Sequence, residues 1–551
     1  MNKYIFSKRA LLLGLAALPL LADAATTSLE GEFRTGPAII LITILILFVV
    51  VGIVFRAKDT TDFYAAGRSI SRVGSGMAIA SNWMSAASFL GMAALMYGFG
   101  YHGLAFVVGW TGGYVLLLVL MAGQIRRYGK YTAPDFIGDR YYSQGLRATA
   151  AILVLVISIA YCVGQFGGIG LMFKWILGFN YTWSVIIGGS VVLTYTLISG
   201  MLGVTKNQQI QYVIIIVSFM IPAFLLTFKF DYLWIMPAIG YGQCVSDIVD
   251  GLPVGDLVNS MGHAYAIMPA PEFAMPWDPV TGKSFYVWMA IAFSLMVGTA
   301  GLPHVLQRFY IVPKTSDARW SVVWGLFFIC ILYWFAPVYS ALGVILSSDP
   351  EVGKLAKDAI VVYTAQLGGI HPLVVGLLAA GGVSAAFSTV SGLFVSGASA
   401  FSHDLYVKVF NPDAAPKKQL LMARLGTIVM AVIVTGLALL KLALIGQLVA
   451  VAFSLAACTM FPMFLLGIWW SGSNKQGAIA GVIVGVLISA IALFNSLLGV
   501  DGSAWIAEWM GPWHFGLIGA PLAILSNVVV SKLTKPTPIE IRKFLVEQVH
   551  S

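Results

Sequence analysis

The sequence predicts an all-α integral membrane protein with about thirteen membrane-spanning helices. Hydrophobic residues make up 59% of the 551 positions, charged residues only 10%, and the mean hydropathy is +0.89. A soluble domain is about one-quarter charged, so this chain has too few charges to cover a water-exposed surface. The 58 glycines are typical of helices that pack closely in a bilayer. Lipid is therefore the solvent for most of the chain.

Residues 1–24 have the form of a signal peptide. A basic start precedes an apolar run over residues 10–21 that is too short to span a bilayer, and residues 22–24 have the small-x-small pattern of a cleavage site. A short first membrane helix is the alternative interpretation. Cleavage would leave residues 25–551 as a single polytopic domain with its N-terminus outside.

Thirteen apolar segments follow, each about as long as a helix must be to cross the hydrocarbon core. Backbone polar groups in lipid must pair within the protein, and runs of this length achieve that only as helices. The predicted span cores are residues 37–55, 75–98, 104–123, 148–173, 182–199, 210–228, 285–300, 320–347, 372–399, 420–440, 443–470, 477–498 and 512–531.

Lys and Arg orient these spans. With the mature N-terminus outside, the predicted cytoplasmic loops carry 22 basic residues and the predicted outer loops carry 7. Because cytoplasmic loops are rich in Lys and Arg, we expect a multi-pass protein of the bacterial inner membrane with a periplasmic N-terminus and a cytoplasmic C-terminus. The net charge of +9 is thus assigned to loops, and no nucleic-acid partner is expected.

On this assignment all 23 Asp and Glu residues lie in loops or tails. Proton-coupled carriers usually relay protons through carboxylates inside the membrane. A coupling-ion site in this chain is therefore predicted to use neutral oxygens and to bind Na⁺ rather than H⁺ or a divalent metal. Arg308 falls in a predicted cytoplasmic loop, and no Arg or Lys is evident at membrane depth to pair with an anionic solute.

The sequence predicts neither an enzyme nor a cofactor. Three of the four cysteines fall in predicted spans and Cys244 stands alone in a loop, so no disulfide framework follows. The histidines lack the clustered spacing of a zinc site. The G-x-G-x-x-G pattern at residues 98–103 joins two membrane helices rather than a strand and a helix, and no P-loop motif is present.

Two segments rich in small and hydroxyl residues are candidates for an ion site. Residues 80–91 form a weak helix in lipid, and carriers use broken helices to turn backbone carbonyls toward an ion. Ala385, Ser388 and Thr389 are spaced i, i+3, i+4 and share one helix face. One carbonyl and two hydroxyls there could meet carbonyls from the first segment around a small cation. Close helix packing is the alternative role for such residues.

A third break is predicted at residues 298–303, where two glycines and Pro303 end the seventh span. A helix that continues unchanged through this proline is disfavoured. An ordinary helix terminus is the alternative interpretation.

Four motifs, in this order, resemble the sodium:solute symporter family, and most closely its cation/acetate symporter branch. The resemblance covers about residues 37 to 531. The motifs are Asp62-Phe63-Tyr64-Ala65-Ala66-Gly67-Arg68, Met84-Ser85-Ala86-Ala87-Ser88-Phe89-Leu90-Gly91, Gly298-Thr299-Ala300-Gly301-Leu302-Pro303-His304 with Arg308-Phe309, and Ser402-His403-Asp404-Leu405-Tyr406.

The resemblance implies a LeuT-like core of two inverted five-helix repeats, over about residues 75–228 and 285–470. The segments 37–55, 477–498 and 512–531 would then be peripheral helices. Carried over from the family, the sodium ligands are the carbonyls of Ser81, Met84 and Ala385 and the hydroxyls of Ser388 and Thr389.

The resemblance also implies sodium-coupled uptake of a small monocarboxylate such as acetate. An anion is attracted to the positive ends of broken helices. The residues at the two breaks are therefore the candidates for the substrate site, namely Ser85, Ser88, Gly298, Thr299 and Gly301.

Two positions depart from the family pattern. Gln208 stands where the family often has Asp, which argues against a charged inner ion-release step. Asn82 stands where the acetate branch often has Asp, which argues against acetate itself. A sodium symporter for propionate, pyruvate, lactate, proline or a sugar is one alternative. A transporter-like sensor that signals to a separate partner is another.

Overall fold

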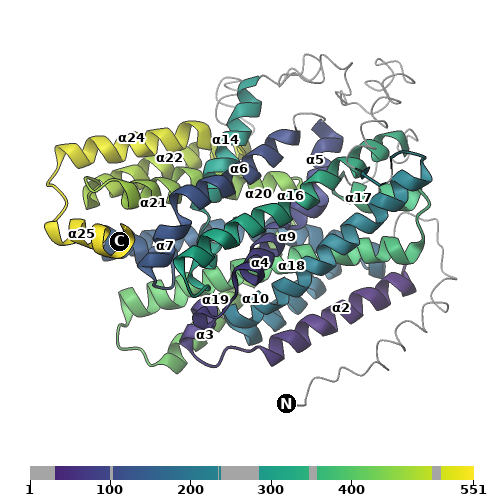
Figure 1. The fold of residues 1–551 in the computed structure, drawn as a ribbon, viewed down its shortest axis with the longest axis horizontal. Helices are drawn as coiled ribbons and strands as arrows, with labels where there is room; N and C mark the ends of the chain where they lie inside the picture. Colours follow the sequence, from purple (N-terminus) through teal and green to yellow (C-terminus); the bar gives the residue numbers. More distant parts are fainter. Residues whose placement is uncertain are drawn as a thin grey trace.

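All regular structure in the described residues is helical, as the sequence predicts (Figure 1). The computed structural model describes residues 32–99, 103–233, 235–237, 285–346, 357–498 and 511–550. The predicted signal segment, residues 1–24, and Cys244 lie outside these ranges.

Eight of the thirteen predicted spans are helices without a sharp bend. Their bounds lie within about five residues of the predicted segments, because apolar length defines them, except that the ninth span continues past its predicted end. They are α2 (Thr35–Val54), α9 (Gln144–Leu177), α16 (Thr315–Leu346), α18 (Pro372–Ser399) continued by η8 (Ala400–Phe410), α19 (Pro416–Ala438), α20 (Ile445–Cys458) with α21 (Met460–Trp469), α22 (Lys475–Leu498) and α24 (Gly516–Leu533).

Three more spans are bent by more than 40° at a short break. The first joins α4 (Arg72–Trp83) to η3 (Ala87–Gly91) and α5 (Met92–Phe99), at 64°. The second joins α6 (Leu104–Leu120) to α7 (Ala122–Tyr128), at 52°. The third joins α14 (Phe285–Gly301) to α15 (Pro303–Leu306) and η5 (Gln307–Tyr310), at 48°.

The two remaining predicted spans, residues 182–199 and 210–228, form one long element, α10 (Tyr181–Lys229), of 49 residues. A continuous α-helix of this length would be about 73 Å long, more than twice the hydrocarbon thickness of about 30 Å. Its backbone is broken at Gly200, where φ is 60° and ψ is −168°. A side chain there would also approach Phe63 and Ala57. Nine helices pass as spans in the described chain, or twelve with each bent pair counted once, and division at Gly200 gives the thirteen expected.

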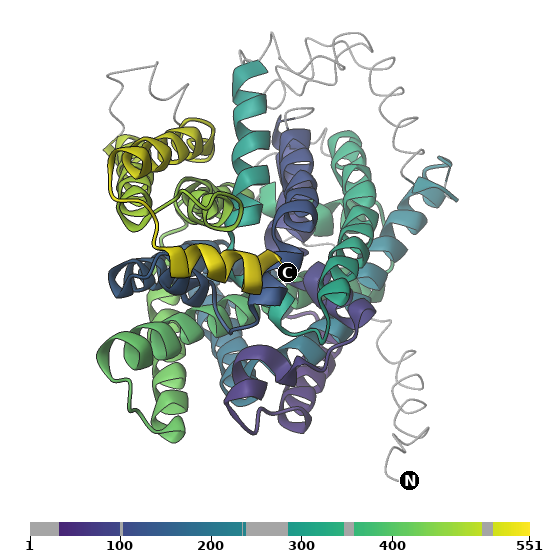
Figure 2. The same ribbon diagram turned by 60° about the vertical axis from the view of Figure 1, so that its left-hand side comes forward.

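Shorter helices connect the spans at their ends. They are α3 (Thr60–Ala65), η2 (Ala66–Arg68), α8 (Ala133–Arg140), η7 (Lys357–Ala359), α17 (Ile360–Leu367), α25 (Ile539–Phe544) and η9 (Leu545–His550). Figure 2 shows the C-terminal α25 lying across the neighbouring helices. His550 of η9 contacts the carbonyl of Ile468 at 2.8 Å, which fixes this end of the chain to α21.

Two of the three bent spans occupy corresponding positions in the two predicted groups of five helices. The α4–α5 pair begins the first group and the α14–α15 pair begins the second, as in a LeuT-like arrangement. Figure 1 shows α4, α9, α10 and α18 in the middle of the bundle, with α22 and α24 on one side and α2 on the other. Within the apolar window of each span, 83% of the α18 residues are buried, against 39% for α2. The elements with the hydroxyl-rich sequence thus lie in the interior.

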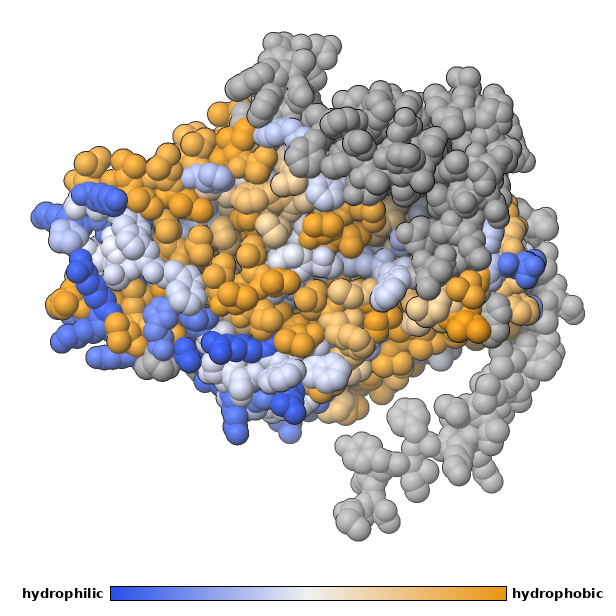
Figure 3. Space-filling view, turned by 45° about the horizontal axis from the view of Figure 1, so that its top comes forward, coloured by the Kyte–Doolittle hydropathy of each residue, from blue (hydrophilic) through white to orange (hydrophobic). Residues whose placement is uncertain are grey.

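The surface has the distribution expected of a protein surrounded by lipid. Figure 3 shows hydrophobic side chains over the middle of the molecule and hydrophilic ones gathered toward one end. Large exposed apolar residues such as Ile46, Val432 and Leu525 come from α2, α19 and α24. Side chains of this size would form an aggregating surface in water, so the flanks require a bilayer.

We predict that Gly485→Ala destabilises the packing of α22 while Gly436→Ala does not. A Cβ at Gly485 would lie 2.1 Å from the Cys458 carbonyl oxygen, whereas nothing lies within 4 Å of one at Gly436. Overpacking of this kind costs about 1–3 kcal/mol. Thermal unfolding of the purified variants should give a lower midpoint for the first and an unchanged or higher midpoint for the second. Equal midpoints would contradict the close approach of α22 to the end of α20.

Candidate ion and solute site

The break between α4 and α5 frees backbone groups in the middle of the bundle. Met84 leaves the helical conformation with ψ of 62°. The Ser88 N–H then donates to the Ser85 carbonyl at 3.0 Å, which leaves the Met84 carbonyl outside the α-helical ladder. The Ala86 N–H is satisfied instead by the side chain of Gln165 in α9, at 2.8 Å. A buried backbone donor requires such a partner, so α9 holds the break open.

Two hydroxyls of α18 meet the carbonyls at the end of α4. The Ser388 hydroxyl donates to the Ser81 carbonyl at 2.6 Å and lies 2.8 Å from the Ala385 carbonyl. The Thr389 hydroxyl donates to the Asn82 carbonyl at 2.8 Å and lies 3.2 Å from the same Ala385 carbonyl. All of these residues are buried. Five uncharged oxygens from two helices therefore converge at one point.

This cluster contains four of the five predicted sodium ligands, Ser81, Ala385, Ser388 and Thr389. Met84, the fifth, is buried at the adjacent break, and no hydrogen bond in the described chain joins it to the α18 hydroxyls. The Asn82 carbonyl is a member that the sequence analysis did not identify. Nothing in the sequence distinguishes this carbonyl, because the position of the helix break determines which backbone carbonyls face the site.

Amide side chains support the cluster from one side. Gln208 of α10 donates from Nε2 to the Ser388 carbonyl at 2.7 Å and to Asn82 Oδ1 at 3.2 Å. The two positions that depart from the family pattern thus contact each other beside the predicted ion site. Both are neutral, so the oxygens that face this point carry no formal charge.

Ser85 and Ser88, predicted to bind substrate, lie against a group of aromatic rings. The Ser88 hydroxyl pairs with the Tyr333 hydroxyl at 2.9 Å, and the Ser85 hydroxyl accepts a hydrogen bond from the Ala87 N–H at 3.2 Å. The Trp83 indole donates to the same Tyr333 oxygen at 3.1 Å. The rings of Trp110, Tyr114 and Phe453 pack around Trp83 with centroids 4.8 to 6.5 Å away. The Tyr161 ring also packs on Phe453, with ring centroids 5.6 Å apart. These buried hydroxyls and rings form a group that is here called the aromatic cluster.

The other three predicted substrate residues lie at helix contacts. A Cβ on Gly298 would be 2.3 Å from the Phe453 carbonyl oxygen, and one on Gly301 would be 2.7 Å from the Ala456 carbonyl oxygen. The Thr299 hydroxyl donates to Leu295 within its own helix at 2.7 Å. These residues allow α14 to pack closely on α6 and α20. The side chain of Thr299 does not join the Ser85–Ser88 group, and the two glycines have none.

Arg308 is buried beside the ion site and carries two unused donors. Its Nη1 donates to the Thr205 hydroxyl at 3.0 Å, while Nε and Nη2 have no hydrogen-bond partner in the described structure. A Cβ on Gly392 would lie 3.1 Å from Nη2 and 2.2 Å from Asn82 Oδ1. Gly392 is one helical turn after Ser388 on α18, which places the guanidinium next to the predicted sodium ligands.

The burial of Arg308 overturns the expectation that no Arg or Lys lies at membrane depth. Arg308 is only 1% exposed and belongs to the second half of a bent span. One helical turn earlier, His304 is equally buried, and neither ring nitrogen has a partner among the described residues. The His304 ring packs on Tyr161 of the aromatic cluster at 5.4 Å. Polar residues that follow a proline directly, as they do after Pro303, are typical of a loop, so the sequence does not reveal this burial.

Comparison with known proteins identifies the family. The model of the sodium:solute symporter family matches residues 63–485. The chain belongs to the sodium:solute symporter family. It is a transporter rather than an enzyme, and the solute that it carries with Na⁺ is not defined by this match.

One sequence relative and two solved structures illustrate what this symporter is similar to. An uncharacterised symporter of Cupriavidus necator is 28% identical, and the alignment covers 91% of each chain. The solved structure of a Na⁺-coupled sialic acid symporter, substrate-bound and outward-open, matches with a TM-score of 0.70 at 18% identity and covers 91% of this chain and 99% of that one. The nucleobase-cation-symport-1 transporter Mhp1 matches with a TM-score of 0.44 at 14% identity. At 18% identity the sialic acid symporter supports the LeuT-like fold alone.

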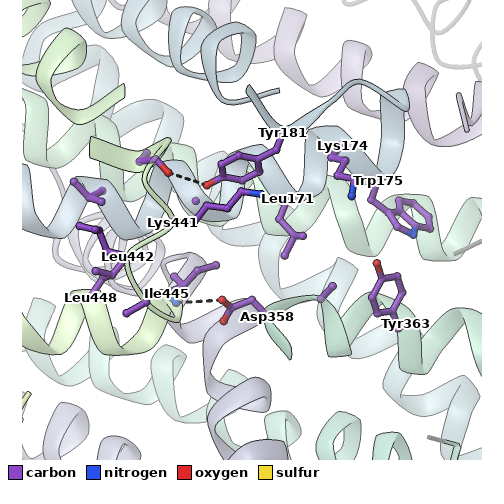
Figure 4. Close-up of a pocket in the computed structure, with 15 residues that line it drawn as sticks. Leu171, Lys174, Trp175, Tyr181, Asp358, Tyr363, Lys441, Leu442, Ile445 and Leu448 are labelled. Carbon is purple, nitrogen blue, oxygen red and sulfur yellow. Dashed lines mark hydrogen bonds between the residues drawn. The ribbon is translucent and has the colours of Figure 1, made fainter. Parts of the chain in front are cut away.

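The symporter has a pocket of about 220 Å³ on its predicted outer side, between α9, η7 and the start of α20 (Figure 4). Figure 4 shows Lys441 beside Tyr181, whose hydroxyl donates to Ala438, and Asp358 directed at Ile445. Asp358 accepts a hydrogen bond from the Ile445 N–H at 3.2 Å, and burial raises the pKa of Asp358 to about 7. The pocket shares α9 with the Gln165 contact at the break, so it lies along a helix that supports the ion site.

The expectation that every acidic residue of the symporter lies in a loop or tail is wrong for Asp404. This residue is fully buried in η8, which continues the α18 span. The helix extends eleven residues beyond the predicted span end because tertiary packing buries its polar turn. Asp404 lies fifteen residues after Thr389, about four turns away, and it is not part of the ion site.

We predict that Ser388→Ala with Thr389→Ala weakens Na⁺ binding at least about tenfold, since each tenfold corresponds to about 1.4 kcal/mol. Two neutral ligands would be lost without a change in charge. Equilibrium binding of ²²Na⁺ to the purified symporter measures this. Thr427→Ala with Thr435→Ala is the matched control, because both hydroxyls donate within their own helix, α19. An unchanged Na⁺ affinity in a folded Ser388–Thr389 variant would exclude this site.

Proposed function

We propose that this symporter imports a small monocarboxylate such as acetate, driven by the inward Na⁺ gradient. Arg308 is the observation that carries the proposal. A guanidinium buried without a counter-charge is costly by several kcal/mol, and no acidic side chain in the described chain lies within 4.0 Å of it. An anionic solute would supply the missing charge.

The geometry of the free donors favours a carboxylate. Nε and Nη2 form one edge of the guanidinium, and they are the two nitrogens of Arg308 without a partner. This edge donates two parallel hydrogen bonds to the two oxygens of a carboxylate. Thr205 holds the opposite nitrogen, Nη1, at 3.0 Å and so fixes the orientation of the group. His304 adds a further unpaired donor on the same helix face.

The aromatic cluster favours a small solute. The Ser88 and Tyr333 hydroxyls already pair with each other, and the Ser85 hydroxyl accepts from the Ala87 N–H. The rings of Trp83 and Trp110 pack edge to face, with centroids 6.5 Å apart. A short aliphatic chain would contact these rings while its carboxylate reaches Arg308 and His304, whereas a sugar would need more polar partners than the cluster offers.

Coupling follows from the charge of Arg308 beside the ion site. A sodium ion at Ser388 and Thr389 and the guanidinium repel each other across a buried space. A carboxylate that binds Arg308 relieves this repulsion, so ion and solute each favour the binding of the other. Rocking of one helix bundle against the other would then carry both across the membrane. A neutral solute would leave the repulsion in place.

We predict that Arg308→Gln lowers uptake of labelled acetate into proteoliposomes at least about tenfold, because the solute carboxylate loses one charged hydrogen-bonding partner. Na⁺ affinity should stay the same or rise, because a repelling charge is removed. Arg308→Lys should keep partial uptake. Arg542→Gln, an exposed residue of α25, is the matched control.

The same assay identifies the solute class. Propionate, pyruvate and lactate should compete with acetate in the wild-type protein, while proline and sugars should not. Full uptake by Arg308→Gln, or competition by neutral solutes as strong as by carboxylates, would contradict a carboxylate held by Arg308.

A further inference from the structure

A second group of buried ionisable residues lies at the predicted cytoplasmic end of the bundle, far along α18 from the sodium site. Asp135 belongs to α8, and His403 and Asp404 belong to η8. Each offers one ligand atom, and these atoms all lie within 4.8 Å of one another. Asp135 is 1% exposed and Asp404 is fully buried.

Each of the two carboxylates has one oxygen in use and one without a partner. The Thr132 hydroxyl donates to Asp404 Oδ1 at 2.8 Å, and His403 Nε2 lies 3.0 Å from Asp135 Oδ2. Asp135 Oδ1 and Asp404 Oδ2 have no hydrogen-bond partner in the part of the chain that the structure describes. Buried polar atoms are normally paired, so these two oxygens indicate a missing positive group.

The basic residues around the cluster do not fill that role. Lys130 and Arg147 both pair with Asp139, the latter at 2.5 Å. Lys408 is exposed on η8. Of the described residues, only His403 forms an ion pair with either buried carboxylate. Two carboxylates thus lie together in the interior with their compensating charges directed elsewhere.

We propose that Asp135, His403 and Asp404 bind one divalent first-row transition metal ion. Carboxylate oxygens and an imidazole nitrogen are a ligand set suited to Mn²⁺, Fe²⁺ or Zn²⁺. The unpaired Asp135 Oδ1 and Asp404 Oδ2 would be the oxygen ligands. His403 Nε2 would exchange its contact with Asp135 Oδ2 for the metal.

The surrounding contacts already orient two of the three ligands. Thr132 holds Asp404 Oδ1 at 2.8 Å, and Gln419 Nε2 lies 3.3 Å from His403 Nδ1, to which it donates as placed. With the amide turned over, the Gln419 oxygen would accept from an Nδ1–H of the metal-bound tautomer. Outer partners of this kind fix the direction of a ligand and raise metal affinity. The two positive charges of a divalent cation balance the two carboxylates, whereas Na⁺ would balance only one of them.

Metal binding would fasten two segments that are 268 residues apart in the sequence. One is α8, which lies between the third and fourth spans, and the other is the end of the helix that carries Ser388 and Thr389. An ion that binds only the folded arrangement stabilises it. The inference does not depend on the solute proposed above, because the two sites share no residue.

The test uses the full-length protein in nanodiscs, stripped of metal with a chelator and titrated with Mn²⁺. We expect one Mn²⁺ per chain, a higher thermal midpoint, and a ¹⁴N coupling from His403 in the electron paramagnetic resonance spectrum. His403→Ala and Asp404→Asn should each weaken Mn²⁺ binding at least about 100-fold, since even outer partners are worth 10- to 100-fold. Asp413→Asn, an exposed carboxylate just after η8, is the matched control and should bind as the wild type does.

Four results would overturn the proposal. The first is wild-type binding no tighter than that of His403→Ala. The second is Mn²⁺ bound to the wild-type protein without ¹⁴N coupling in the spectrum. This measurement needs no variant, so it is decisive even if Asp404→Asn does not fold. The third is stabilisation by acid in the absence of metal with none from Mn²⁺ or Zn²⁺, because the two carboxyls would then share a proton. Loss of Mn²⁺ binding in the Ser388–Thr389 variant would also contradict a separate site.

Discussion

The contact between two hydroxyls of α18 and the carbonyls at the end of α4 is the constraint on which the rest of the structure depends. A membrane helix normally satisfies its own carbonyls, so carbonyls become available only where a helix is broken. The break after Trp83 supplies them, and Gln165 of α9 satisfies the amide that the break exposes. Ser388 and Thr389 then close the point from the opposite repeat. Helix breaking, burial of α18 and support by α9 are parts of one arrangement.

The positive charge of Arg308 lies next to this uncharged ion site. The oxygens toward α4 and α18 carry no formal charge, while the positively charged Arg308 lies against Gly392, one helical turn after Ser388. Burial of that charge is unfavourable unless a partner arrives. In the proposed mechanism an anionic solute is that partner, and its binding also reduces the repulsion between Arg308 and Na⁺. The close packing at Gly298 and Gly301 holds the helix that carries Arg308 against α20.

The sequence alone predicts the parts of this structure that depend on local pattern. Apolar length gives the thirteen spans, and the i, i+3, i+4 spacing of Ala385, Ser388 and Thr389 gives the face that meets α4. Parts that depend on tertiary packing were missed. Arg308 follows Pro303 in a polar window that is typical of a loop, and only the fold buries it. Asp135 and Asp404 come together from distant parts of the sequence, so no spacing could reveal them. The Asn82 carbonyl is defined by where the helix breaks.

The central claim is that Na⁺ bound by uncharged oxygens provides the driving force. Its most direct test is accumulation of labelled acetate in proteoliposomes under two separate gradients at the same membrane potential. An inward Na⁺ gradient at equal pH should drive accumulation above equilibrium, and an inward proton gradient without Na⁺ should drive none. Accumulation under the proton gradient alone would contradict the account, because a proton needs a titratable carboxylate that the α4–α18 contact does not contain.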